Sequence, residues 1–220
     1  MDFETEEQQA EAVKKWFSEY GMTIVLGLVI GLGGVFGYRY YNEHQELQME
    51  QASEAYEEVM AVLATDKTKF NDLADKYTEQ HGADTYSNLL GLQRAKLAVE
   101  AKDLASAESA LMAVVSSASH PAVENTARIR LVRIQIALEK YEPALATIAE
   151  ANTDSYQYNY ELLRGDVWLA RGDKERAKKA YTKAKALGAD NPPHPDLEML
   201  LTELASAGTA NKASSGAVND

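Results

Sequence analysis

The chain of 220 residues is acidic, with 34 Asp and Glu against 22 Lys and Arg, and it contains no cysteine. A net charge of −12 argues against nucleic-acid binding, because neutralising phosphates requires clustered Lys and Arg. The absence of cysteine excludes disulfides and thiolate chemistry, and it fits either side of a bacterial membrane.

The first twenty residues are short, mostly polar and net acidic. Ala10, Val13, Trp16 and Phe17 recur at helical spacing within them. This pattern fits a brief amphipathic helix on a membrane surface, and it fits the frayed start of the following helix equally well.

Residues 21–38, GMTIVLGLVIGLGGVFGY, contain no charged side chain. A helix of about 19 residues, counting Tyr20, spans roughly 28 Å, close to the ~30 Å hydrocarbon core of a bilayer. A buried core helix rarely runs so long without a charge, and aromatic residues flank both ends as they do at membrane interfaces. The run exceeds the apolar centre of a signal peptide and no small-residue cleavage site follows it, so we expect a retained transmembrane anchor over residues 21–41.

Positive charge around the anchor indicates its orientation. Lys14 and Lys15 precede the span, Arg39 follows it, and the next cation is Lys67. The excess before the span, two against one, favours a cytoplasmic N-terminus, because the cytoplasmic flank of a span is enriched in Lys and Arg. The residues after the span are then expected outside the cytoplasm.

Glycines form two pairs inside the span. Gly27 and Gly31 are four residues apart, as are Gly33 and Gly37, so each pair lies on one helix face. Such a face allows another helix to approach closely, which would make homo-oligomers or contacts with a partner span. The alternative is that glycine is simply frequent in membrane helices.

Beyond the anchor, apolar residues recur at helical spacing to the end of the chain, and alternating β patterns and Asn-Gly turns are missing. We therefore predict an all-α fold. No glycine or proline separates the span from residues 42–64, so the membrane helix can continue directly into them. Helix-start and helix-stop residues delimit further helices near residues 70–81, 85–99, 103–114, 122–139, 142–148, 156–171, 174–187 and 196–205.

The later helices form a repeat. Lys102-Asp103, Glu139-Lys140 and Gly172-Asp173 are each followed by an alanine four residues after the second residue, at shifts of 37 and 33 residues. These shifts bracket the ~34 residues of a tetratricopeptide repeat, a helix–turn–helix unit. The third unit matches this consensus best, although Glu161 and Arg164 replace its usual tryptophan and leucine. A generic array of helical hairpins is the alternative.

These observations divide the chain into four parts. Residues 1–20 are a short cytoplasmic N-terminus, 21–41 the transmembrane helix, and 42–206 a tetratricopeptide-repeat-like helical domain. Residues 207–220 are small and polar, so we expect a disordered tail.

No catalytic constellation is visible. The four histidines stand singly, without a partner at the spacing of metal ligands, and no carboxylate cluster or nucleophile motif accompanies them. We therefore expect no enzyme activity and no catalytic, cofactor or metal site.

A stacked array instead offers a groove lined by the first helix of each pair. Lys96, Arg133 and Asp166 occupy equivalent positions there, and an apolar row lies one turn earlier, at Leu92, Ile129 and Leu162. The hypothesis is that this row and its mixed charges hold an extended peptide or a partner helix. The alternative is that the charges are solvated and the apolar residues pack the hairpins.

The anchor region resembles a known family. The run from Ala12 to Gly21, AVKKWFSEYG, the glycine-rich span and the run from Gly37 to Gln45, GYRYYNEHQ, are similar to the YfgM family, ancillary subunits of the bacterial SecYEG translocon. The runs Leu131–Gln135, Leu163–Asp166 and Arg171–Asp173 add to this likeness, which covers roughly residues 10–205.

The resemblance implies an inner-membrane protein with a cytoplasmic N-terminus and a periplasmic repeat domain. It also implies association with SecYEG and with the membrane-anchored periplasmic chaperone PpiD, which would aid the handover of emerging proteins. The alternative function is a repeat scaffold for another cell-envelope assembly complex.

Overall fold

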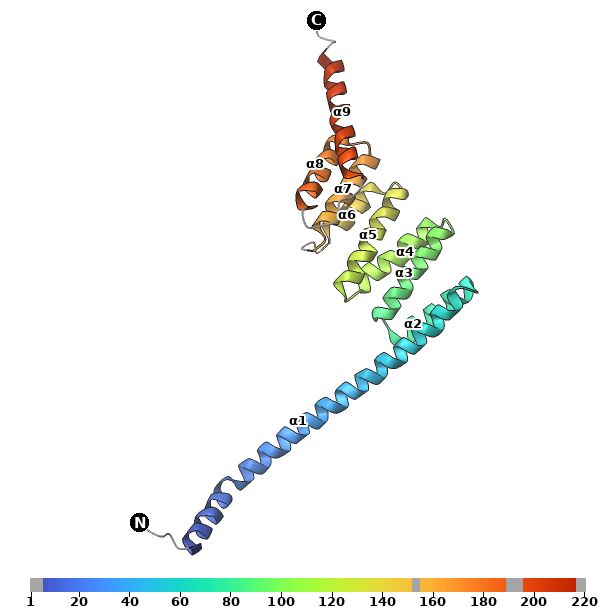
Figure 1. Cartoon of the computed structure of the whole chain (residues 1–220). Helices are drawn as coiled ribbons and strands as arrows, with labels where there is room; N and C mark the ends of the chain where they lie inside the picture. The colour runs from blue at the N-terminus through green and yellow to red at the C-terminus, as the bar shows by residue number, and fades with distance from the viewer. Residues whose placement is uncertain (1–5, 152–154, 189–195, 217–220) are drawn as a thin grey trace. The chain divides into compact units, whose positions relative to one another are not determined.

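The all-α prediction is confirmed by the computed structural model of the protein, which describes residues 6–151, 155–188 and 196–216. No strand occurs in these ranges. The helices in chain order (Figure 1) are α1 (Glu6–Leu63), α2 (Lys67–His81), α3 (Thr85–Glu100), α4 (Leu104–Ser117), α5 (Pro121–Ala137), α6 (Tyr141–Ala149), α7 (Gln157–Ala170), α8 (Lys174–Leu187) and α9 (Leu197–Gly216).

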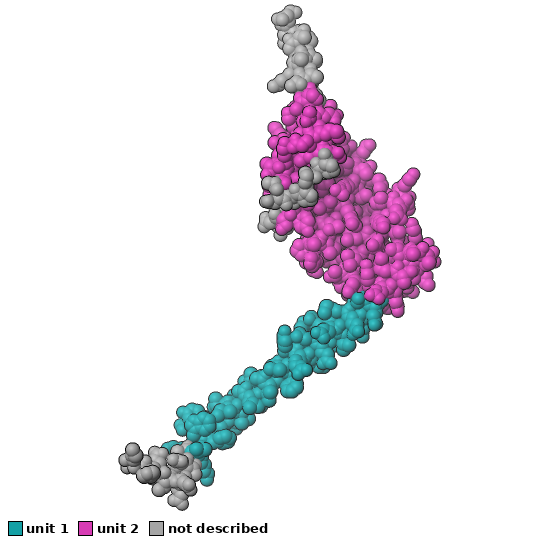
Figure 2. All heavy atoms as spheres, viewed as in Figure 1, with its two compact units in different colours: residues 1–55 teal, residues 56–220 magenta. Residues whose placement is uncertain are grey.

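The chain divides into two compact units, residues 1–55 and residues 56–220 (Figure 2). In the first unit, α1 passes through the predicted span without a break and continues beyond Tyr41, as the missing helix breakers predicted. This helix is long and apolar enough to cross a membrane. Its large apolar side chains are exposed, including Ile30 at 66% and Phe36 at 67%, which fits contact with lipid.

The second unit is an array of helical hairpins, in which helices adjacent in sequence pack on one another (Figure 1). Among the described residues, its core includes three clusters of buried apolar side chains. One joins α3, α4 and α5, the second joins α5, α6 and α7, and the third joins α7, α8 and α9. Each hairpin therefore buries its apolar face against the first helix of the next pair, as stacked repeats do.

The predicted small residue of each repeat lies at the centre of its cluster. Ala107, Ala144 and Ala177 each lie near the start of the second helix of a hairpin, and each is 0% exposed. A larger side chain at these positions would separate the two helices, because protein interiors are close-packed. The repeat period read from the sequence is therefore confirmed.

The predicted turn residues share one backbone conformation. Lys102, Glu139 and Gly172 have φ values of 62°, 58° and 90°, the left-handed region that ends many helices. The following residue in each turn donates its backbone N–H to a carbonyl five residues earlier, over 2.8–2.9 Å. Asp103 and Asp173 then cap the next helix by accepting a backbone N–H from Ser106 and Arg176.

Several boundaries differ from the sequence prediction. α6 begins at Tyr141 rather than Glu142, because the left-handed turn at Glu139 lets the chain re-enter a helix at once. α9 continues to Gly216, whereas the repeat domain was predicted to end at residue 206 and a disordered tail to follow. The proline-rich separator at residues 191–195 and the last four residues lie outside the described residues. The four-part division of the chain stays a prediction.

Candidate partner-binding surfaces

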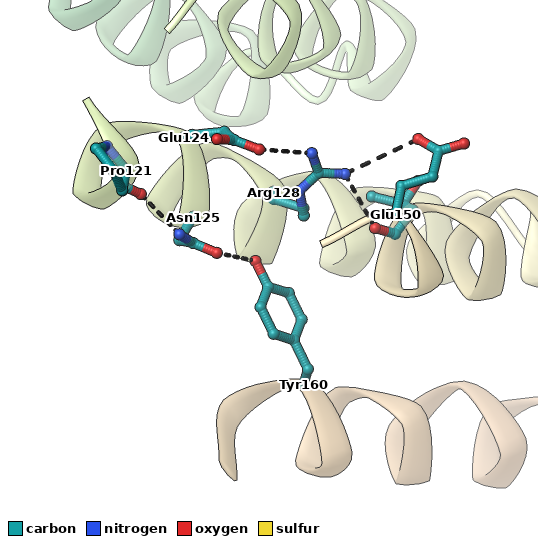
Figure 3. Close-up of polar contacts among 7 residues, drawn as sticks. Pro121, Glu124, Asn125, Arg128, Glu150 and Tyr160 are labelled. Carbon is teal, nitrogen blue, oxygen red and sulfur yellow. Dashed lines mark hydrogen bonds and ion pairs between the residues drawn. The ribbon is translucent and has the colours of Figure 1, made fainter. Parts of the chain in front are cut away.

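A buried polar network fixes the first helix of the central repeat (Figure 3). The side chain of Arg128 on α5 is 7% exposed and pairs with Glu124 over 2.7 Å. Its other terminal nitrogen donates to the carbonyl of Thr147 on α6 over 3.1 Å and lies 4.0 Å from the Glu150 carboxylate. A buried guanidinium destabilises the fold unless carboxylates or carbonyl oxygens pair with it. These contacts therefore hold α5 and α6 in one arrangement.

The same helix is joined to the third repeat. The hydroxyl of Tyr160 on α7 donates to the side-chain oxygen of Asn125 over 2.5 Å, and the amide of Asn125 donates to the carbonyl of Pro121 over 2.7 Å. Burial raises the pKa of Tyr160 to about 12, so its hydroxyl remains a donor. The network therefore ties α5 to both α6 and α7 through buried hydrogen bonds.

A hollow of about 390 Å³ opens between α3 and α5, the first helices of two successive repeats. Core side chains of α3, α4 and α5 form its floor, namely Ala95, Leu111 and Ile134. Val99 also lines it and is 43% exposed, so an apolar side chain is accessible there. The hollow is thus a mainly apolar cleft on the side of the array that carries the first helices.

Cations surround this cleft. Lys96, Arg130 and Arg133 line it, all are exposed, and none forms an ion pair within the described residues. The single carboxylate of the lining, Glu100, already receives a hydrogen bond from Lys67 over 3.0 Å, which lowers its pKa. The cleft therefore presents uncompensated positive charge around an apolar floor, and this combination suits an apolar side chain flanked by carboxylates.

The structure brings together two of the predicted groove residues and separates the rest. Lys96 and Arg133 line the same cleft, as their equivalent repeat positions predicted. Arg130 and Val99 complete it and were missed, although each lies one helical turn from a predicted residue, at a spacing that shares a face.

The predicted apolar row packs against the core clusters of the hairpins. Leu92 is 9% exposed within the core cluster of α3, α4 and α5. Ile129 packs against the second cluster and Leu162 against the third. These contacts agree with the alternative stated for these residues, packing within the hairpins, and their role in partner binding stays a prediction.

Asp166 has a different local role. Its carboxylate accepts a hydrogen bond from the Tyr181 hydroxyl over 2.7 Å, and it does not line the cleft of Lys96 and Arg133. Burial and this hydrogen bond raise the pKa of Tyr181. Asp166 therefore joins α7 to α8 within the third hairpin.

The glycines of the span are open to a neighbour. An added Cβ at Gly27, Gly31, Gly33 or Gly37 would meet nothing within 4 Å. The packing role predicted for these residues therefore concerns another helix and stays a prediction. Across the described parts of the chain, no three His, Asp or Glu side chains gather as metal ligands.

Comparison with known proteins covers almost the whole array and the anchor. The family model of a tetratricopeptide repeat-like domain matches residues 14–206. No solved structure matches the chain significantly.

Three similar proteins are each named "Ancillary SecYEG translocon subunit". That of Aggregatibacter actinomycetemcomitans is 33% identical over 82% of this chain and 88% of its own length. The Haemophilus influenzae protein is 29% identical over 84% of this chain and 90% of its own length. The Escherichia coli K12 protein is 30% identical over 81% of this chain and 86% of its own length.

Proposed function

The chain belongs to the tetratricopeptide repeat-like family of ancillary SecYEG translocon subunits, and from this premise we propose that it is a non-enzymatic interaction protein of the translocon. Similarity along four-fifths of the chain, and a family model that includes the anchor, carry the proposal. Relatives that share only the repeats would support a generic scaffold, because such repeats serve many partners.

In this role α1 anchors the protein in the inner membrane as a single span, with its N-terminus in the cytoplasm and the repeat domain in the periplasm. The apolar, exposed surface of α1 supports the span, and the two lysines before it against one arginine after it support the orientation. The repeat domain then meets proteins as they emerge from the translocon. PpiD is its proposed chaperone partner, and handover of emerging proteins is the proposed task.

The cleft of Lys96, Arg130 and Arg133 is the proposed site for a partner segment. Its apolar floor and unpaired cations support an occupant with an apolar side chain between acidic residues. The proposed binding needs no catalytic group, since the geometry of the repeat array and the charge of its surface supply recognition.

Two measurements test the function. Membranes carrying an affinity-tagged chain are solubilised in mild detergent, and recovery of SecYEG subunits and PpiD with the tag is the expected result. Recovery of a different envelope complex without SecYEG would instead support the alternative scaffold function. Separately, protease applied to spheroplasts should remove a C-terminal epitope tag without lysis, and protection of that tag until lysis would contradict the periplasmic location.

A further inference from the structure

The third hairpin is basic in an otherwise acidic chain. From Gln157 to Leu187 it carries eight Lys and Arg against four Asp and Glu, whereas the chain has a net charge of −12. Positive charge concentrated on one hairpin attracts acidic partners and speeds their association. The surface lies on α7 and α8, away from the cleft between α3 and α5.

Part of this charge converges on a hollow of about 240 Å³ between α7 and α8. Four cations line it, Arg164, Arg176, Lys179 and Lys183, together with Trp168 and a single carboxylate, Glu161. We call this set the basic trough. A second hollow of about 220 Å³ shares Glu161, Arg164 and Lys183 and extends the trough to the end of α6.

The trough exists because the third repeat departs from its consensus. Glu161 and Arg164 stand where tetratricopeptide repeats usually have tryptophan and leucine. Two apolar side chains there would bury themselves against neighbouring helices, whereas charged ones must keep access to water or to partners. Glu161 and Arg164 therefore make the lining of this hollow charged, where the consensus residues would make it apolar.

The one carboxylate of the trough is already neutralised. The Glu161 side chain is 9% exposed and accepts from Lys183 over 2.7 Å, with Arg164 3.3 Å away. Arg176 pairs with Asp173 over 2.9 Å and lies 4.3 Å from the ring centroid of Trp168, while Lys179 forms no ion pair within the described residues. The trough thus has a surplus of positive charge that the hairpin itself does not balance.

The spacing of the trough residues indicates the shape of an occupant. On α8, Arg176, Lys179 and Lys183 recur at intervals of three and four residues, and on α7 the positions 161, 164 and 168 do the same. Each row is about 10 Å long and borders a groove between two helices, into which a third helix packs by ridges and grooves. A helix with carboxylates at the same intervals would face these cations.

We propose that the basic trough binds an acidic helix of a partner protein. A membrane surface fits less well, because these cations lie along one groove between α7 and α8 beside an aromatic ring, and a groove between two helices accepts a third helix better than a flat surface. Guanidinium groups at Arg164 and Arg176 favour carboxylates by geometry as well as charge.

The test uses the full-length chain in detergent micelles and two fluorescent 18-residue peptides of alanine, glutamine and six glutamates. In one peptide the glutamates recur at three- and four-residue intervals on a single helix face, and in the other they are spread around the helix. We expect the striped peptide to bind roughly tenfold more tightly, because only its charges meet the trough together. Equal affinity for both peptides would overturn the proposal.

Variants locate the site. K179Q/K183Q should weaken binding of the striped peptide about tenfold, while the control K174Q/K178Q removes the same charge from α8 outside the trough and should change it little. Equal losses of peptide affinity in both variants would show non-specific charge attraction and would contradict a specific site in the trough. Circular dichroism of each variant confirms that α8 remains folded.

Two further outcomes would overturn the proposal. If K179Q/K183Q loses binding only to vesicles containing phosphatidylglycerol, the surface serves lipid. If the same variant abolishes self-association in sedimentation while leaving peptide binding intact, the occupant is a second copy of the chain.

Discussion

The ring of Tyr181 on α8 lies directly against the backbone of Gly165 on α7. A Cβ added to Gly165 would lie 2.3 Å from Cε1 and 2.4 Å from Cδ1 of the Tyr181 ring. Tyr181 itself is 1% exposed and its hydroxyl is held by Asp166. The closest approach of the third hairpin therefore depends on the absence of a side chain at one position.

Gly165→Ala is expected to destabilise the protein by about 1–3 kcal/mol, because the ring cannot move without losing its packing and its hydrogen bond. Urea unfolding of the full chain in detergent, followed by circular dichroism, measures this change. Tyr181→Leu removes the ring, so the double variant should cost less than the two single variants together. Strict additivity would contradict the contact.

Lys102→Gly and Glu139→Gly are each expected to stabilise the protein by about 0.5–1 kcal/mol. Both residues have φ near +60°, where glycine avoids the clash of a side chain, and this gain exceeds the extra entropy that glycine loses on folding. Neither side chain makes a hydrogen bond or ion pair in the described parts of the chain. The reverse change in the third turn, Gly172→Ala, should destabilise, and the same unfolding measurement compares all three.

Tyr160→Phe is expected to cost about 1–2 kcal/mol at neutral pH, because the oxygen of Asn125 loses its donor while Asn125 remains 4% exposed. Tyr141→Phe is the matched control, since the Tyr141 hydroxyl makes no hydrogen bond among the described residues. An equal effect of both changes would show that the network contributes nothing at Tyr160.

The same tyrosine predicts an alkaline limit to stability. Its pKa rises from an ordinary value of 10.0 to about 12 in the folded chain. A raised pKa means that the neutral hydroxyl stabilises fully below pH 10 and that this contribution is lost as pH rises towards 12. We therefore expect the free energy of unfolding to fall between these pH values, and to fall less in Tyr160→Phe. If the pH dependence of the unfolding free energy were the same in Tyr160→Phe, the loss of stability at high pH would come from other titrating groups.

Charge reversal in the α3–α5 cleft tests the proposed partner site. Lys96→Glu with Arg133→Glu should reduce recovery of the partner subunits several-fold. Reversing these two charges replaces attraction with repulsion towards an acidic partner and so lowers the binding affinity. Lys69→Glu with Lys76→Glu applies the same charge change to exposed positions of α2 and should leave recovery unchanged. Retention of partners by the first variant would remove the cleft from the proposal.

The glycine faces of the span are tested by leucine substitution. Gly27→Leu with Gly31→Leu blocks one face, and Gly33→Leu with Gly37→Leu blocks the other, so each double variant is the control for its counterpart. The measurement is crosslinking of the span to a neighbouring membrane helix. If one double variant loses this crosslink, the glycines that it replaces form the face that meets the other helix. Crosslinking that survives both would leave the glycines as ordinary residues of a membrane helix.

Features that depend on local, periodic patterns could be predicted from the amino-acid sequence. An uncharged run predicted the apolar part of α1, and the recurrence of Ala107, Ala144 and Ala177 predicted the hairpin period, because these patterns repeat within one helix or between identical units. The turn residues were located for the same reason. Their shared left-handed backbone conformation was not predicted, because lysine and glutamate, at positions 102 and 139, do not favour it.

Which helix faces meet one another became visible only in the folded array. Leu92 and Lys96 lie one turn apart on α3 and were assigned to one groove, yet Leu92 is buried in the core and Lys96 lines the cleft. The pairing of Tyr160 with Asn125, 35 residues apart, likewise depends on how α7 rests on α5. A helical pattern gives the spacing of residues along one helix, but burial is set by the crossing of several helices, and no single helix contains that information.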